Sequence, residues 1–173
     1  KAQGQFVFMV TRQGISKKSL LKNFSRPRSA GLIAVDLADN DELVEVGLTD
    51  GESDILLFSS AGKVIRFPES HVRPMGRTAR GVRGIKLKPN QAVISMLIID
   101  SGTDEAKVLI ATENGYGKRT KLADFPRKSR GGQGVIAIKV GERNGPVVGA
   151  QMVLDDDDLI LITGGGRLVP GAW

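Results

Sequence analysis

Internal repetition constrains the fold of this chain more than any other feature of its sequence. An apolar run, a turn glycine and then basic residues recur four times within the 173 residues. The runs are FVFMVTRQGISKK at 6–18, ILLFSSAGKVIRF at 55–67, VLIATENGYGKRT at 108–120 and LILITGGGRLV at 159–169. Their turn glycines, Gly14, Gly62, Gly115 and Gly166, are separated by 48, 53 and 51 residues. A near-constant period of this length is typical of solenoids and propellers, so we expect a fold built from similar units.

A second motif stays in phase with the first. GLIAVDL begins at Gly31, GVRGIKL at Gly81 and GVIAIKV at Gly134, which is 17, 19 and 19 residues after the turn glycine of the same repeat. Two motifs held in phase three times indicate units of about 50 residues. We place their boundaries at about 6–53, 54–106 and 107–157, with a partial unit at 158–169.

Each repeat contains four short runs that are typical of strands. In the third repeat they are 108–111, 116–120, 135–140 and 147–154, rich in Val, Ile and Leu and bounded by turn residues. No segment has a long apolar period of 3.6 residues, so helix is at most a minor component. The sequence therefore predicts an all-β chain of propeller-like blades with about four strands each. Three blades and a leading strand form an incomplete ring, and we expect an exposed blade edge.

Basic residues are concentrated at the same place in the first three repeats. The net charge is +6, but the segments 14–31, 62–88 and 115–139 hold 20 of the 25 lysines and arginines and two of the 19 acidic residues. These segments carry +18, and the rest of the chain carries −12. For a single segment, a solvated face would explain the charge. Stacked repeats would instead align the segments along one rim, which favours an anionic polymer whose counterions are released on binding.

The candidate binding residues are lysines and arginines of these three segments. They are Lys17, Lys18, Arg26, Arg28, Lys63, Arg66, Arg73, Arg77, Arg80, Arg83, Lys118, Arg119, Lys121, Arg127, Lys128 and Arg130. Lys18, Arg66 and Arg119 share one offset, four residues after the turn glycine.

The apolar residues within the basic segments favour duplex DNA over a single strand. Phe24, Val72 and Phe125 each lie ten residues after the turn glycine, and this recurrence is typical of a core anchor. Single-stranded nucleic acid would instead call for aromatic platforms among the basic residues. No segment predicts a recognition helix. We expect a duplex held by its phosphates, with little sequence preference.

Catalytic chemistry has little support in the sequence. Cysteine is absent, which removes thiolate nucleophiles and zinc–cysteine sites, and His71 is the only histidine. The run Asp155–Asp158 indicates a solvated loop, because consecutive residues of a strand point to opposite sides and suit a shared Mg²⁺ poorly. We expect no catalytic residue, metal or cofactor here, and the apolar runs are too short to cross a membrane.

The spacing of one glycine-rich segment does not decide between two functions for it. KSRGGQG at 128–134 combines two cations with three glycines. Successive amides in such a segment can cradle a phosphate, but an ordinary loop between strands has the same composition.

The repeats resemble the C-terminal domain of the DNA gyrase A protein. The resemblance extends from about Phe6 to Val169. It is strongest in LLFSSAGKVIRFPESHVRPMGRTARGVRGIKL at 56–87 and ATENGYGKRTKLADFPRKSRGGQGVIAIKVGERNGPVVGA at 111–150. It implies a β-pinwheel, which in this family is a disc of six blades with DNA wrapped around a basic perimeter to set the direction of supercoiling. This chain would supply the middle-to-late blades.

Two features depart from the family pattern. The heptapeptide Q-R-R-G-G-K-G of the first blade is missing, and KSRGGQG keeps four of its seven residues, Arg130, Gly131, Gly132 and Gly134. At the C-terminal end, Pro170 would interrupt a strand that the family continues.

The resemblance also implies partners and a cellular setting. The chain would be a non-catalytic part of an ATP-dependent type IIA topoisomerase, with ATP and Mg²⁺ used by other domains. Its partners would be duplex DNA, the rest of the gyrase A protein and the gyrase B protein, in a heterotetramer at the nucleoid of the bacterial cytoplasm. The alternatives are the related C-terminal domain of topoisomerase IV and a propeller-type module that binds an acidic protein.

Overall fold

The computed structural model describes residues 5–24, 37–76, 79–101, 105–153, 159–162 and 167–170. The strands are β1 (Phe6–Thr11), β2 (Ile15–Leu20), β3 (Leu43–Thr49), β4 (Asp54–Ser59), β5 (Lys63–Pro68), β6 (Val82–Arg83), β7 (Val93–Ile99), β8 (Lys107–Thr112), β9 (Gly117–Lys121), β10 (Val135–Ile136), β11 (Val147–Val153), β12 (Leu159–Ile162) and β13 (Arg167–Pro170). Within these ranges the helical segments are three short 3-10 turns, η1 (Leu21–Phe24), η2 (Glu69–His71) and η3 (Leu122–Asp124). The predicted all-β class is confirmed.

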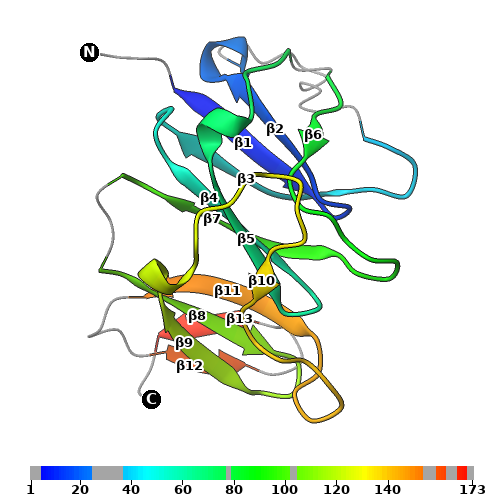
Figure 1. Cartoon of the computed structure of the whole chain (residues 1–173), viewed down its shortest axis with the longest axis vertical. Helices are drawn as coiled ribbons and strands as arrows, with labels where there is room; N and C mark the ends of the chain where they lie inside the picture. Colours follow the sequence, from blue (N-terminus) through cyan, green and yellow to red (C-terminus); the bar gives the residue numbers. More distant parts are fainter. Residues whose placement is uncertain are drawn as a thin grey trace.

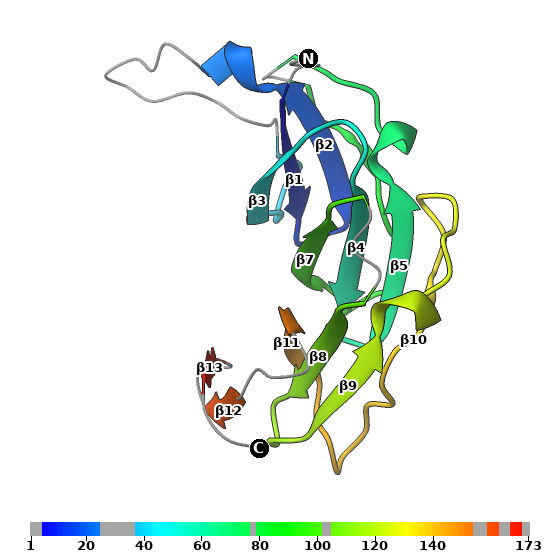
Figure 2. The same cartoon turned by 90° about the vertical axis from the view of Figure 1, so that its left-hand side faces the viewer.

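The strands form three antiparallel sheets that stack along the chain, followed by the hairpin β12–β13 (Figure 1). Seen from the side, the sheets follow an arc (Figure 2). Strands β3, β7 and β11 lie on its concave side, and β2, β5 and β9 lie toward its convex side, which we call the outer edge. The sheets of the described residues do not close a ring, as expected for an incomplete one.

Two of the sheets are completed by a strand from the following repeat. Their orders are β3-β1-β2-β6 and β7-β4-β5-β10. β6 pairs Val82 with Ser16 of the first repeat, and β10 pairs Val135 with Val64 of the second. The expectation that the four runs of one repeat make one blade was therefore wrong for the third run. The third sheet has the order β11-β8-β9, so among the described residues β9 has no outer neighbour.

The middle sheet explains why its central strand is apolar at consecutive positions. β4 is buried along its whole length, because its two faces contact different sheets. Ile55 and Leu57 lie in the core shared with β1, whereas Leu56 and Phe58 lie in the core shared with β8. A strand buried on both faces needs a continuous apolar run. Each of these side chains contributes roughly 1.5–3 kcal/mol through its removal from water.

The turn glycines and the core anchors occupy the places that the repeats predict. Gly14 and Gly62 have φ angles of 93° and 83°, in the left-handed region that favours glycine. Val72 is fully buried, and Phe125 is 4% exposed. The ring of Phe125 packs edge-on against Phe58, with centroids 6.3 Å apart. The anchor role is confirmed for these two residues, and the side chain of Phe24 lies outside the described set.

Candidate nucleic-acid interface

The sixteen predicted binding residues fall into four groups. The exposed ones are Arg73, Arg80, Arg83, Lys118, Lys121, Arg127 and Lys128. Lys63, Arg119 and Arg130 are partly exposed, and Lys17, Lys18 and Arg66 are buried. Arg26, Arg28 and Arg77 lie outside the described residues, as does the acidic run Asp155–Asp158. Only a side chain that reaches solvent can contact a phosphate, so the burial of the third group does not fit the role that the sequence predicted for it.

Four of the exposed cations lie on one edge of the arc. Arg83 lies in β6, Lys118 and Lys121 lie in β9, and Lys128 follows η3. In the sheet orders, β6 and β9 are at the opposite end from β3 and β11. They therefore belong to the outer edge (Figure 2). Exposed acids lie mainly elsewhere, for example Glu52 in the connection from β3 to β4. Four exposed cations of the second and third repeats thus lie on this edge, and a basic rim along the whole arc remains a prediction from the sequence.

Lys18 of β2 is 4% exposed and points into the junction with the second repeat. Its Nζ donates to the main-chain oxygen of Glu69, 3.1 Å away, and lies 3.4 Å from Glu69 Oε1. The same Nζ lies 4.8 Å from the centroid of the Phe6 ring. Glu69 itself is fully buried and also accepts from Thr49 Oγ1 at 2.8 Å and from the amides of Gly51 and Ser53. A buried carboxylate is tolerated only when it is saturated in this way.

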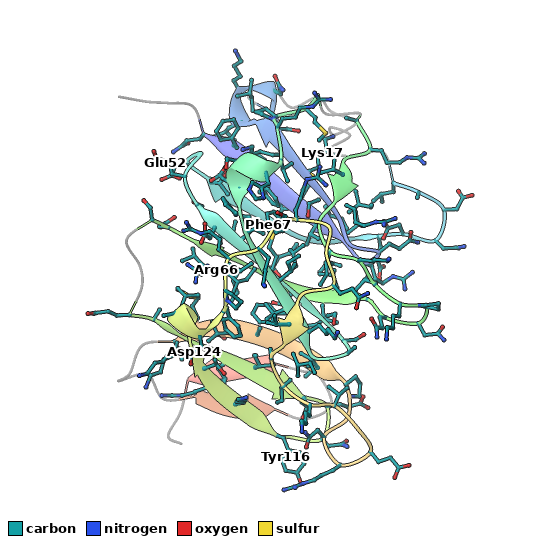
Figure 3. All side chains as sticks on the ribbon, in the orientation of Figure 1. Lys17, Glu52, Arg66, Phe67, Tyr116 and Asp124 are labelled. Atoms are coloured by element: carbon teal, nitrogen blue, oxygen red, sulfur yellow. The ribbon has the colours of Figure 1, made fainter. Side chains whose placement is uncertain are left out.

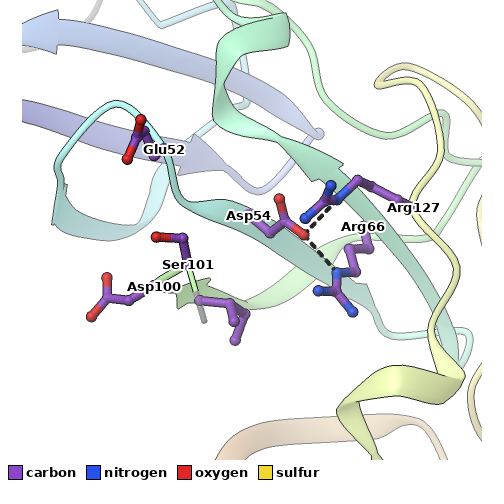
Figure 4. Close-up of a pocket in the computed structure, with 7 residues that line it drawn as sticks. Glu52, Asp54, Arg66, Asp100, Ser101 and Arg127 are labelled. Carbon is purple, nitrogen blue, oxygen red and sulfur yellow. Dashed lines mark hydrogen bonds and ion pairs between the residues drawn. The ribbon is translucent and has the colours of Figure 1, made fainter. Parts of the chain in front are cut away.

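Arg66 of β5 has the equivalent place at the next junction, in the middle of the molecule (Figure 3). Its Nη1 donates to the main-chain oxygens of Leu122 and Phe125, at 3.0 and 3.3 Å. Its Nε donates to Asp54 Oδ2 at 2.8 Å. That oxygen also accepts from Nε of Arg127, at 2.9 Å, so one buried carboxylate holds two guanidinium groups (Figure 4).

Sequence reasoning missed the two acids that hold these cations. Glu69 carried a signal, because it is one of only two acidic residues in the basic segments. Asp54 carried none, since acidic residues are common in the connections between repeats. Their carboxylates form ion pairs with cations from other parts of the chain, and only the packing of the sheets brings these groups together.

The loop 128–134 is tied to the preceding repeat. The amide of Gly131 donates to the oxygen of Gly84, and the oxygen of Gly132 accepts from the amide of Lys86, at 2.7 and 2.8 Å. Arg130 donates from Nε to the oxygen of His71 and from Nη1 to the oxygen of Arg83, both at 3.0 Å. These contacts favour a loop that joins strands over a cradle for phosphate.

An exposed arginine–tyrosine pair lies at the far end of the third sheet. Tyr116 projects from the turn between β8 and β9 (Figure 3), and Arg143 Nε donates to its hydroxyl at 3.3 Å. The guanidinium carbon lies 5.0 Å from the ring centroid. The hydrogen bond and the electrostatic attraction of Tyr116 raise the pKa of Arg143.

A cavity of about 30 Å³ lies beside Asp54, between Glu52 and Asp100, and has room for water only (Figure 4). No group of three histidines or acids in the described ranges is arranged to hold a metal ion. In the same ranges, no helix has the length and apolar character needed to span a bilayer.

The chain matches the family model described as DNA gyrase C-terminal domain, beta-propeller. The match occurs three times, over residues 5–50, 53–100 and 106–153. Together these ranges cover more than half of the chain.

Curated relatives and solved structures agree with this match. The DNA gyrase A protein of Salmonella typhimurium is 58% identical over 96% of this chain, and that of Staphylococcus aureus is 41% identical over 98%. The chain spans only 19% of the length of each relative. The C-terminal domain of DNA topoisomerase IV superposes with a TM-score of 0.87 at 28% identity, over 98% of this chain and 53% of that one. The DNA gyrase A C-terminal domain gives 0.83 at 26% identity, over 96% and 55%.

Proposed function

Because this chain belongs to the DNA gyrase C-terminal domain family, we propose that it binds duplex DNA along the outer edge of its arc. The binding is electrostatic and independent of sequence, since phosphates carry no sequence information. The observation that supports it is the gathering of exposed cations from the second and third repeats on that edge.

The curvature of the arc determines how a bound duplex would be bent. Smooth bending of a 20–30 bp site costs on the order of 1–6 kcal/mol, which phosphate contacts must offset. A duplex that contacts cations along the convex side would be bent around the stacked sheets. In a larger parent protein, such bending with a fixed hand would set the direction of supercoiling.

In this proposed function, the catalytic chemistry of the parent protein lies outside this chain. Strand cleavage, ATP and Mg²⁺ act in other domains of the gyrase A protein and in the gyrase B protein, and this chain contributes the DNA surface. This role would place it at the nucleoid of the bacterial cytoplasm. The closely related alternative is the same role in a topoisomerase IV.

Neutralising exposed cations should weaken DNA binding and reduce its salt dependence. We choose Arg83, Lys118, Lys121 and Lys128, because all four are exposed. Each phosphate contact contributes about −0.9 to the slope of log K against log salt, so replacing all four by glutamine should lower its magnitude by about 3 to 4. The measurement is a titration of a labelled duplex at several salt concentrations, repeated with an unrelated sequence.

The control replaces acids that lie off the outer edge. Asp50→Asn with Glu52→Gln should leave the affinity equal or slightly higher, because both acids are exposed in the connection between β3 and β4. If the quadruple variant stays folded and keeps the full slope, the outer edge is a solvated face. The propeller-type module for an acidic protein partner would then be the better proposal.

A further inference from the structure

Lys18 and Arg66 occupy the same position in their repeats and make the same contact with the repeat that follows. Each lies four residues after its turn glycine, and each is buried. Lys18 donates to the main-chain oxygen of Glu69, and Arg66 donates to that of Leu122. Both acceptors lie seven residues after the next turn glycine, at the first residue of η2 or η3.

The main chain of the same two residues holds the next repeat as well. The oxygen of Lys18 accepts from the amide of Met75, and the oxygen of Arg66 accepts from the amide of Lys128, each at 2.7 Å. Both donors lie thirteen residues after their turn glycine. Side chain and backbone therefore join each pair of repeats at one point, and the second junction repeats the geometry of the first.

A buried acid neutralises the cation at each junction, but it comes from a different position. Glu69 of η2 is paired with Lys18, and Asp54 of β4 is paired with Arg66. The second junction has an additional tie, because Asp54 also holds Arg127 of the third repeat. An unpaired buried charge would be strongly unfavourable, so neither cation could stay buried without its acid.

We propose that Lys18 and Arg66 are clasp residues, which join consecutive sheets, and not phosphate ligands. The basic segments then contain cations with different roles. Lys18 and Arg66 fix how one sheet sits on the next, and the exposed cations are left free of this role. The clasp itself does not depend on DNA binding. Only its consequence for the curvature of the outer edge rests on the proposed function.

Amide hydrogen exchange of the whole chain without DNA tests the clasp. Arg66→Gln and Asp54→Asn should accelerate exchange at least tenfold at the amides of Lys128 and Ala137, which cross the second junction. The amides of Met75 and Gly84, which cross the first junction, should change less than twofold. Glu52→Gln neutralises an exposed acid beside the cavity that Asp54 and Arg66 line. It should change the exchange rate of neither pair of amides.

The conservative variant keeps the test decisive if the glutamine variant does not fold. Arg66→Lys places a lysine at the second junction, as Lys18 is at the first. A lysine has fewer hydrogen-bond donors than the arginine it replaces. It should accelerate exchange at Lys128 by a smaller factor than glutamine does, and more than Glu52→Gln. Equal acceleration at both junctions, or none at the second, would overturn the clasp.

The salt dependence of DNA binding separates the clasp from a phosphate contact. Arg66→Gln should leave the slope of log K against log salt unchanged, whereas loss of a phosphate contact would reduce its magnitude by about 0.9. A reduced slope in a folded variant would overturn the proposal. If the unaltered chain binds no duplex, the proposed function fails, but the exchange result still decides the clasp.

Discussion

Replacing Glu69 by alanine should lower the free energy of unfolding by about 3–5 kcal/mol, because it breaks a buried ion pair by removing one partner. Lys18 would be left buried without its carboxylate, and Thr49 Oγ1 and the amides of Gly51 and Ser53 would lose their acceptor. Glu69→Gln should have a smaller effect, because the amide oxygen can still accept from part of this set. Urea denaturation followed by circular dichroism measures both.

Glu52→Ala is the matched control for this loss. It removes the same type of side chain, only 17 residues away, but from an exposed position. Its effect should stay within about 0.5 kcal/mol. If the two alanine variants unfold at the same urea concentration, the carboxylate of Glu69 does not stabilise the junction, and its burial needs another explanation.

Gly62→Ala should destabilise the chain by about 3–4 kcal/mol, through strain and loss of contacts at the second junction. A left-handed backbone costs a residue with a Cβ about 1–2 kcal/mol. A Cβ at Gly62 would also lie 2.1 Å from the main-chain oxygen of Ile138. The two repeats would have to separate there, which weakens the hydrogen bonds from the amides of Ala137 and Ile138 to the oxygen of Gly62, at about 1 kcal/mol each.

Gly51 offers a control with a similar backbone and no close neighbour. Its φ is 97°, but a Cβ there would be 3.4 Å from the nearest atom, Cε2 of Phe6. Gly51→Ala should therefore cost only the conformational part, about 1–2 kcal/mol. Thermal or urea unfolding of both variants gives the comparison. Equal losses would mean that the close approach of the third repeat to Gly62 has no energetic weight.

The repeats predicted the sheets well because apolar runs and turn glycines are local signals. Ile55 to Phe58 form a continuous apolar run in the sequence, and the structure buries both faces of that strand. The recurrence of an apolar residue ten positions after the turn glycine likewise identified Val72 and Phe125 as core residues. These features depend on the pattern within one repeat, and a sequence displays that pattern directly.

What the sequence could not predict depends on contacts between repeats. Val82 and Arg83 form a strand of only two residues, too short to carry a period, and their pairing with the preceding repeat is decided by how the sheets stack. The same applies to the side chains of Lys18 and Arg66. Charge patterning showed that they belong to basic segments, but not that they point inward to partners far along the chain.

The strand taken from the following repeat also sets an order of assembly during synthesis. The first sheet has three of its strands once Thr49 has been made, but its fourth waits for Arg83, 34 residues later. At 5–20 residues per second, the outer side of β2 stays uncapped for roughly 2–7 s on the ribosome. Unpaired edges invite pairing with another chain, and lysine is a common deterrent. β2, β5 and β9 each carry at least two lysines or arginines. Mutual repulsion between such edges lets a nascent chain wait for its own next repeat.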